Sequence, residues 1–209
     1  MGMEMDMYGR LITIFLGFFA ITNPIPNTAV FAGLTRKVDK AERYRIAVKS
    51  TLIAFGVVVF FSLLGKTLFH LLGITLPALR ITGGILVFII GYQMLQGYNS
   101  TSHSEDDGDT DIAVSPIAVP ILVGPGTIAT AMNYSASEGS MGAIMTISMY
   151  ALLGLITFFC FIFSARVVAI IGGNGLKIIT QLMGLILAVI GIQLLIAGIY
   201  EVVTMTGDL

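Results

Sequence analysis

The 209-residue chain is too apolar for a soluble domain. Hydrophobic residues make up 56% of it and charged residues 11%, against about 45–50% and about 25% in soluble proteins, and its mean hydropathy is +0.94. A net charge of −1 provides no basic surface for nucleic acid. The single cysteine, Cys160, excludes an internal disulfide framework. The composition therefore predicts a membrane protein.

Six apolar stretches set the expected fold. A bilayer core about 30 Å thick needs roughly 20 mostly apolar residues for each helical span. The stretches that qualify are Tyr8–Leu34, Ala47–Leu72, Arg80–Tyr98, Ala113–Ala136, Ala143–Ala165 and Leu176–Val203. They are continuously apolar and lack the alternation of a membrane β-barrel. We therefore expect an all-α membrane protein with six transmembrane helices.

The distribution of basic residues predicts the orientation. The densest cluster follows the first stretch and consists of Arg36, Lys37, Lys40, Arg43, Arg45 and Lys49. Basic loops face the cytoplasm in most membrane proteins. We therefore expect this loop, and the loop between the fifth and sixth stretches, to be cytoplasmic. Both termini would then lie outside a multi-pass protein of the cell (inner or plasma) membrane.

A polar linker divides the chain into two halves. Residues 99–112 are acidic and polar, and they separate residues 1–98 from residues 113–209, with three spans in each half. The acidic run departs from a calcium-binding EF-hand loop, since Ile112 stands where glycine is needed and Ala118 where the final glutamate belongs. We interpret the segment as a solvated hinge.

The two halves resemble each other. GILVFIIGYQML (residues 84–95) aligns with GLILAVIGIQLL (residues 184–195) at an offset of 100, with both glycines and the glutamine identical. Pro24 aligns with Pro125 at an offset of 101. Because each half has three spans, the second half must cross the membrane in the opposite sense to the first. The sequence thus predicts a 3+3 inverted repeat, a recurrent architecture of secondary transporters; a duplication without transport function is the alternative.

Helix breakers interrupt the first span of each half near its middle. They are TNPIPNT (residues 22–28) and VGPGTIA (residues 123–129). Proline removes a backbone donor and clashes with the preceding turn, and glycine has low helix propensity. We expect discontinuous first and fourth helices, unwound at the breaks and resuming near Thr28 and Thr127, with Asn27 and Thr127 as N-caps. Simple kinks in a packed bundle are the alternative.

Two such breaks, brought together by inverted symmetry, suit a small zwitterion. A resuming helix presents N–H groups and about half a positive charge, and the half-helix before it presents carbonyls and about half a negative charge. The predicted substrate-binding residues are Asn23, Pro24, Ile25, Asn27, Thr28, Gly124, Pro125, Gly126, Thr127, Gln93 and Gln193.

Two features of this pattern also have a packing interpretation. Gln93 and Gln193 are suited to hydrogen bonds between helices, which we favour slightly over contact with a ligand. Gly184, Gly191 and Gly198 recur every seven residues, a spacing typical of a close helix-packing seam.

The central parts of the spans carry no carboxylate or histidine, so we expect no buried proton relay. Coupling would use a cation such as sodium held by backbone carbonyls, or the protein would be an uncoupled facilitator. No cofactor is expected. No nucleophile–base pair or metal-ligand cluster stands out, so we do not expect an enzyme.

Two motifs carry a family resemblance that extends over nearly all six spans. SPIAVPILVGPGTIATAM (residues 115–132) has a proline-rich lead into a Gly-Pro-Gly turn, and ITNPIPNTAVFAGLT (residues 21–35) has an Asn-Pro-Ile break. Both resemble the MarC family of integral membrane proteins, which includes the SnatA-type small neutral amino acid transporters. Pro26 stands where that family usually has glycine, and Ala29-Val30 replaces its Ile-Pro. The resemblance implies transport of glycine, alanine or similar amino acids.

The sequence leads to two hypotheses. In the first, the chain is a secondary transporter of small neutral amino acids, with its substrate held at two midplane breaks and alternating access. In the second, it is a non-transporting membrane scaffold or regulatory component that uses the acidic linker, or an exporter of other small solutes. The expected partners are the substrate and the lipid bilayer, not nucleic acid, and the oligomeric state is left open.

Overall fold

The computed structural model describes residues 2–36, 38–73, 75–97, 122–137 and 139–207. The helices along these residues are α1 (Gly2–Thr22), α2 (Pro24–Leu34), α3 (Lys40–Leu72), α4 (Leu76–Leu95), α5 (Pro125–Ser137), α6 (Gly139–Ile162) and α7 (Ser164–Gly207). The polar linker at residues 99–112 and the first part of the fourth expected span lie outside the described residues.

Within the described ranges, five helical stretches are long and apolar enough to cross a membrane. They are Met7–Leu34, Lys40–Gly65, Leu76–Leu95, Ser140–Ile162 and Ser164–Thr204. Each overlaps one of the expected spans. The remaining expected span, residues 113–136, is described only from residue 122 onward, and α5 forms its second part.

Apolar side chains cover the outside of the bundle, and hydroxyl groups lie inside. Leu52, Ile144 and Ile196 are about 60% exposed, whereas Thr146 and Thr157 are buried. The two buried threonines donate to carbonyls one turn earlier in their own helix, at 2.7 and 2.9 Å, so their burial leaves no donor unpaired. An apolar exterior around a partly polar interior is what a lipid solvent selects.

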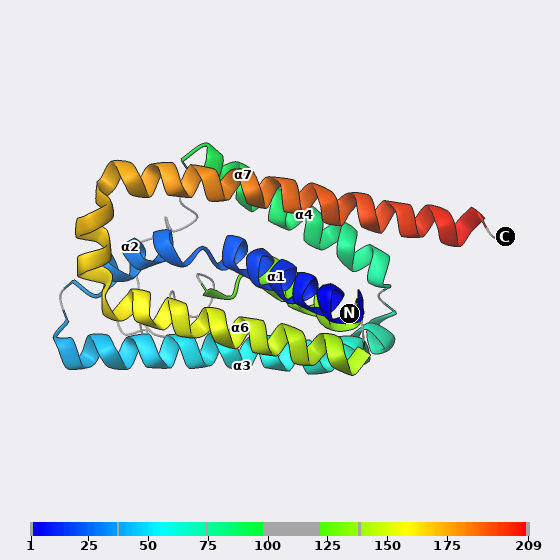
Figure 1. The fold of residues 1–209 in the computed structure, drawn as a ribbon, viewed down its shortest axis with the longest axis horizontal. Helices are drawn as coiled ribbons and strands as arrows, with labels where there is room; N and C mark the ends of the chain where they lie inside the picture. The colour runs from blue at the N-terminus through cyan, green and yellow to red at the C-terminus, as the bar shows by residue number, and fades with distance from the viewer. Residues whose placement is uncertain (1, 37, 74, 98–121, 138, 208–209) are drawn as a thin grey trace.

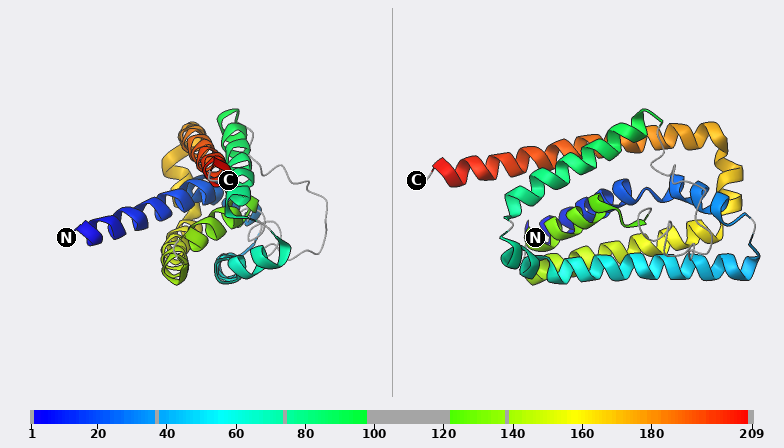
Figure 2. Two further views of the ribbon diagram at one scale, coloured as in Figure 1. Left: turned by 90° about the vertical axis from the view of Figure 1, so that its right-hand side faces the viewer. Right: turned by 180° about the vertical axis from the view of Figure 1, so that it is seen from behind.

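The helices form three groups (Figures 1 and 2). The antiparallel helices α3 and α6 lie along one side of the bundle, the antiparallel pair α4 and α7 lies along the other, and α1, α2 and α5 run between them. The end of α2 and the start of α3 lie at the same end of the bundle as the junction of α6 with α7. This agrees with the shared side expected for the two basic loops; its assignment to the cytoplasm stays a prediction.

The contact between α4 and α7 is made by backbone atoms. A Cβ atom added to Gly91 would lie 2.5 Å from the Ala188 nitrogen, and one added to Gly191 would lie 2.5 Å from the Phe88 nitrogen. Real Cβ atoms do not approach backbone this closely, so only glycine permits the packing. The seven-residue glycine spacing of the last span is therefore a helix-packing seam, as expected from the sequence.

Two helix starts differ most from the expected ones. Helix α3, the second expected span, begins at Lys40, seven residues before the expected Ala47. It begins there because the Asp39 carboxylate accepts from the Glu42 N–H at 2.7 Å and caps the helix. The last helix begins at Ser164 instead of Leu176, and it bends at Gly172, whose φ of 68° interrupts the regular coil. The bend is visible at the left of Figure 1.

Candidate functional site

The first predicted break is confined to one residue, Asn23. This residue has φ 46° and ψ 64°, in the left-handed region, and separates α1 from α2. A residue before proline is disfavoured in the right-handed helical region, and asparagine adopts the left-handed one more readily than most residues. Pro24 and Pro26 lie inside α2, so the expected unwinding of residues 23–27 was wrong. Proline is favourable in the first turn of a helix, because φ is already set and no N–H is needed there.

Asn27 and Thr28 support this break from within α2. The Asn27 amide donates to the Thr22 carbonyl at 2.5 Å. In a continuous helix this carbonyl would accept from the N–H of residue 26, but Pro26 has none. The Thr28 hydroxyl donates to the Pro24 carbonyl at 2.7 Å. Asn27 is therefore not the N-cap that the sequence predicted; Asn23 occupies that position, without a side-chain cap bond.

The second break precedes α5, which begins at Pro125. The Ile128 N–H donates to the Gly124 carbonyl at 3.2 Å, so Thr127 lies in the first helical turn and is not the N-cap. Thr127 is 2% exposed. Upstream, the Leu122 carbonyl accepts from the Tyr150 hydroxyl at 3.3 Å, which ties this segment to α6.

The two breaks adjoin. A Cβ atom on Gly126 would lie 3.8 Å from Ile21 of α1, and 3.3 and 3.4 Å from Ile90 and Val87 of α4. On the α2 side, the Asn23 amide points to the Met94 sulfur of α4 at 3.9 Å. Helix α4 is thus a common wall for both breaks.

From these adjoining starts, α2 and α5 run toward opposite ends of the bundle (Figures 1 and 2). Each helix start carries about half a positive charge and first-turn N–H groups without helical partners. Opposed helix starts next to each other form an electropositive place inside the protein, which can bind a small anionic group such as a carboxylate.

The comparisons with known proteins identify the family. The model for "MarC family integral membrane protein" matches residues 8–203. The chain belongs to the MarC family. It is 37% identical to the UPF0056 membrane protein YvbG of Bacillus subtilis, covering 92% of this chain and 95% of the relative. It is 33% identical to the UPF0056 membrane protein MJ1677 of Methanocaldococcus jannaschii, covering 90% and 95%. It is 28% identical to the UPF0056 inner membrane protein MarC of Salmonella paratyphi A, covering 95% and 98%. No solved structure matches it.

Membership of the MarC family confirms the resemblance found in the break motifs and makes the chain a multi-pass integral membrane protein. The names of these three relatives state a membrane location and give no substrate or enzymatic activity.

Most of the predicted site residues of this MarC family protein lie at the two breaks, but the glutamines do not. Gln93 on α4 and Gln193 on α7 are both exposed, although Met94, the next residue, is buried against Asn23. Successive residues of a helix point about 100° apart, which turns the Gln93 amide away from the break. Their positions match each other through the repeat, and the structure places neither in contact with a break.

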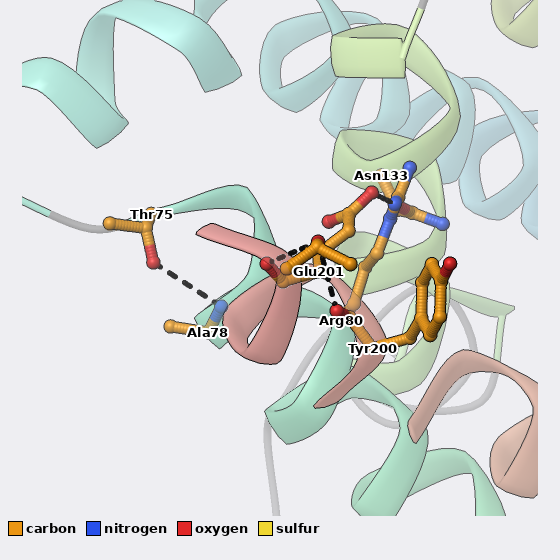
Figure 3. Close-up of polar contacts among 7 residues, drawn as sticks. Thr75, Ala78, Arg80, Asn133, Tyr200 and Glu201 are labelled. Carbon is orange, nitrogen blue, oxygen red and sulfur yellow. Dashed lines mark hydrogen bonds and ion pairs between the residues drawn. The ribbon is translucent and has the colours of Figure 1, made fainter. Parts of the chain in front are cut away.

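Sequence reasoning missed a polar cluster that joins three helices (Figure 3). The Nε of Arg80 on α4 donates to the Asn133 side-chain oxygen on α5 at 2.8 Å, and the same guanidinium forms an ion pair with Glu201 on α7. Arg80 stands at the end of an expected span, where a basic side chain can equally extend to the membrane surface. The available signal was topological: the start of the third span and the end of the sixth lie on the same side of the membrane, so opposite charges there can meet.

Proposed function

We propose that this MarC family protein is a secondary transporter of small neutral amino acids such as glycine and alanine, working by alternating access. The observation that carries the proposal is the arrangement of Pro24 and Pro125. Each begins a helix, the two helix starts adjoin, and the helices run in opposite directions. A carboxylate lying between them would face two positive helix ends and their N–H groups.

The same place supplies partners for an ammonium group. The last turn of α1 presents its carbonyls there, with about half a negative charge. Because Pro24 has no N–H, the Ala20 carbonyl lacks the donor that a continuous helix would supply. A zwitterion can therefore lie with its carboxylate toward the starts of α2 and α5 and its ammonium toward the end of α1.

The surroundings of Gly126 support a small substrate. A single added carbon at this glycine would already contact Ile90, Val87 and Ile21. An apolar wall at that distance suits a hydrogen or a methyl side chain, and larger side chains would need it to move. The chemistry of the site thus favours glycine and alanine over bulky amino acids.

We also infer a 3+3 inverted repeat. Besides the aligned prolines, α4 and α7 cross at glycines whose pairing is symmetric. A Cβ on Gly84 would meet Gly191, and a Cβ on Gly91 would meet Gly184. Adding 100 to the number of Gly84 gives Gly184, and subtracting 100 from that of Gly191 gives Gly91. The first pair is thereby converted into the second. A two-fold axis relating the halves produces this exchange.

Uptake of labelled glycine or alanine into proteoliposomes tests the proposal. We expect saturable uptake above that of empty vesicles, competed by the unlabelled amino acid and much less by leucine or phenylalanine. Running the assay with sodium, with potassium and with a proton gradient identifies the coupling ion, if there is one. Absence of saturable flux from correctly folded protein under all three conditions would reject transport of these amino acids.

A further inference from the structure

The cluster of Arg80, Asn133 and Glu201 lies between the proposed substrate site and one end of the bundle. Asn133 is eight residues beyond Pro125 on α5, which is about 12 Å along a helix. It lies toward the end of the bundle where α3 and α5 end and α4 and α6 begin (Figure 1). We call this the α5 end.

The three side chains of this cluster are sheltered. Asn133 is 6% exposed, and the side chains of Arg80 and Glu201 are 17% and 32% exposed. Charge-assisted hydrogen bonds of this kind are about twice as strong as neutral ones. Next to Asn133, the Tyr134 ring packs edge-on against Phe18 of α1, with 6.0 Å between ring centroids. Helix α5 is therefore attached to α1 and α4 at the same level.

The α4–α7 seam determines which bond of the cluster breaks when the α5 end opens. A Cβ on Gly198 would lie 2.9 Å from the Pro77 carbonyl, so α4 and α7 are in backbone contact one turn from Arg80 and Glu201. The ion pair therefore lies within one rigid helix pair. The bond from Arg80 to Asn133 links that pair to α5, and it is the bond that breaks when α5 moves away.

The residues at the equivalent positions of the other half carry no charge. The repeat offsets relate Arg80 to Thr180, Glu201 to Thr101, and Asn133 to Ala32. Thr180 donates to the Leu176 carbonyl in its own helix, at 2.8 Å. The charges of this cluster are thus not a property that the repeat imposes on both halves.

We propose that Arg80, oriented by its ion pair with Glu201, clamps Asn133 and so holds the α5 end of the substrate path closed. The proposal rests on the transport function proposed above. Arg80 and Asn133 form the clamp, and Glu201 is a positioning residue. The clamp favours the conformation that is closed at the α5 end, and opening this end requires α5 to leave α4.

Cysteine labelling measures the opening of the α5 end without any substrate. Thr130 is the reporter position, because it is buried, its hydroxyl has no partner among the described residues, and it lies one turn from Asn133 toward the break. In a Cys160→Ala background, Thr130→Cys is labelled with a small maleimide applied at the α5 end of protein oriented in vesicles. The rate of labelling reports how often this end opens.

Two kinds of variant should open this end. Asn133→Leu removes the acceptor at nearly constant volume, and the double variant R80M/E201M removes both charges together, which leaves no buried charge unpaired. We expect each to raise the labelling rate about tenfold, which corresponds to ~1.4 kcal/mol. In contrast, N133D/E201Q moves the acidic partner onto α5 and keeps Arg80 paired, so we expect labelling at or below the wild-type rate.

An exposed ion pair provides the matched control. Arg45 and Glu42 lie 3.9 Å apart, with side chains 79% and 49% exposed, and R45M/E42M should leave labelling unchanged. Wild-type labelling rates in Asn133→Leu and R80M/E201M, with unchanged thermal unfolding, would overturn the clamp. A faster rate in N133D/E201Q would also overturn it, and this variant decides the question if the others fail to fold.

The two proposals fail separately in this experiment. If the variants change labelling but no amino acid is taken up, the clamp stands and the substrate assignment is wrong. If glycine is taken up but the labelling rates do not respond, the transport proposal stands and the clamp is wrong.

Discussion

Two substitutions of Asn23 separate its backbone role from contact with a ligand. Its φ of 46° lies in a region that costs most L-residues about 1–2 kcal/mol, but not glycine. Asn23→Ala should therefore lower the free energy of unfolding by about this amount. At about 2–4 °C per kcal/mol for a chain of this size, its melting temperature should fall by a few degrees.

Asn23→Gly keeps the backbone conformation and removes only the amide. In the folded protein this amide makes one weak contact, to the Met94 sulfur at 3.9 Å, so we expect little loss of stability. If the amide binds a charged end of the substrate, its loss should cost about 1.5–3 kcal/mol. That range corresponds to a rise of about 10- to 150-fold in the glycine concentration needed for half-maximal uptake.

Thermal unfolding in detergent and concentration-dependent uptake by proteoliposomes measure the two effects. The reasoning about the backbone fails if the alanine and glycine variants melt together at the wild-type temperature. The assignment of Asn23 to the substrate site fails if the glycine variant takes up glycine with wild-type affinity.

Three further substitutions test the packing around the site. Gly91→Ala places a Cβ 2.5 Å from the Ala188 nitrogen and should destabilise the protein by about 1–3 kcal/mol, whereas Gly56→Ala, with open space around it, should not; equal melting temperatures would contradict the seam. Gly126→Leu should abolish uptake by filling the space between Ile21 and α4, with Gly56→Leu as the control, and wild-type uptake by a folded Gly126→Leu protein would remove Gly126 from the site. Asp39→Ala should lower stability by about 0.5–2 kcal/mol through loss of the α3 cap, seen as an earlier melting transition.

Local chemistry predicted much of this fold. The apolar runs located the spans, because the bilayer fixes the length of a membrane helix. The aligned Pro24 and Pro125 located the breaks, but the helices start at these prolines and not near Thr28 and Thr127 as expected. The seven-residue glycine spacing predicted the close packing of α7. The predicted extent of the first break was wrong, because the prediction treated both prolines as helix breakers. Pro24 and Pro26 are instead compatible with the first turn of α2. The break instead depends on Asn23, which precedes proline.

Tertiary pairing was harder to predict. Nothing near Arg80 in the sequence distinguishes a side chain that reaches the membrane surface from one that turns inward. The difference comes from Glu201, 121 residues away, which the antiparallel packing of α4 on α7 brings to it. Gln93 and Gln193 illustrate the same limit. Their match in the repeat indicated equivalent positions in the two halves. The direction of each side chain, however, depends on which face of its helix the glycine seam occupies.

For the proposed alternating access, the α4–α7 seam limits which helices can move. It joins the last helix of the first half of the chain to the last helix of the second half through backbone contacts that tolerate no Cβ, so we expect α4 and α7 to move together. Both breaks pack on α4, through Asn23 to Met94 and through Gly126 to Val87 and Ile90. Access can then alternate if α2 and α5 leave α4 in turn. The α2 side makes a weak contact to the Met94 sulfur of α4 and packs mainly on α6 and α7, whereas the α5 side is bonded to an ion-paired arginine of α4. We therefore expect the two openings to differ in free energy.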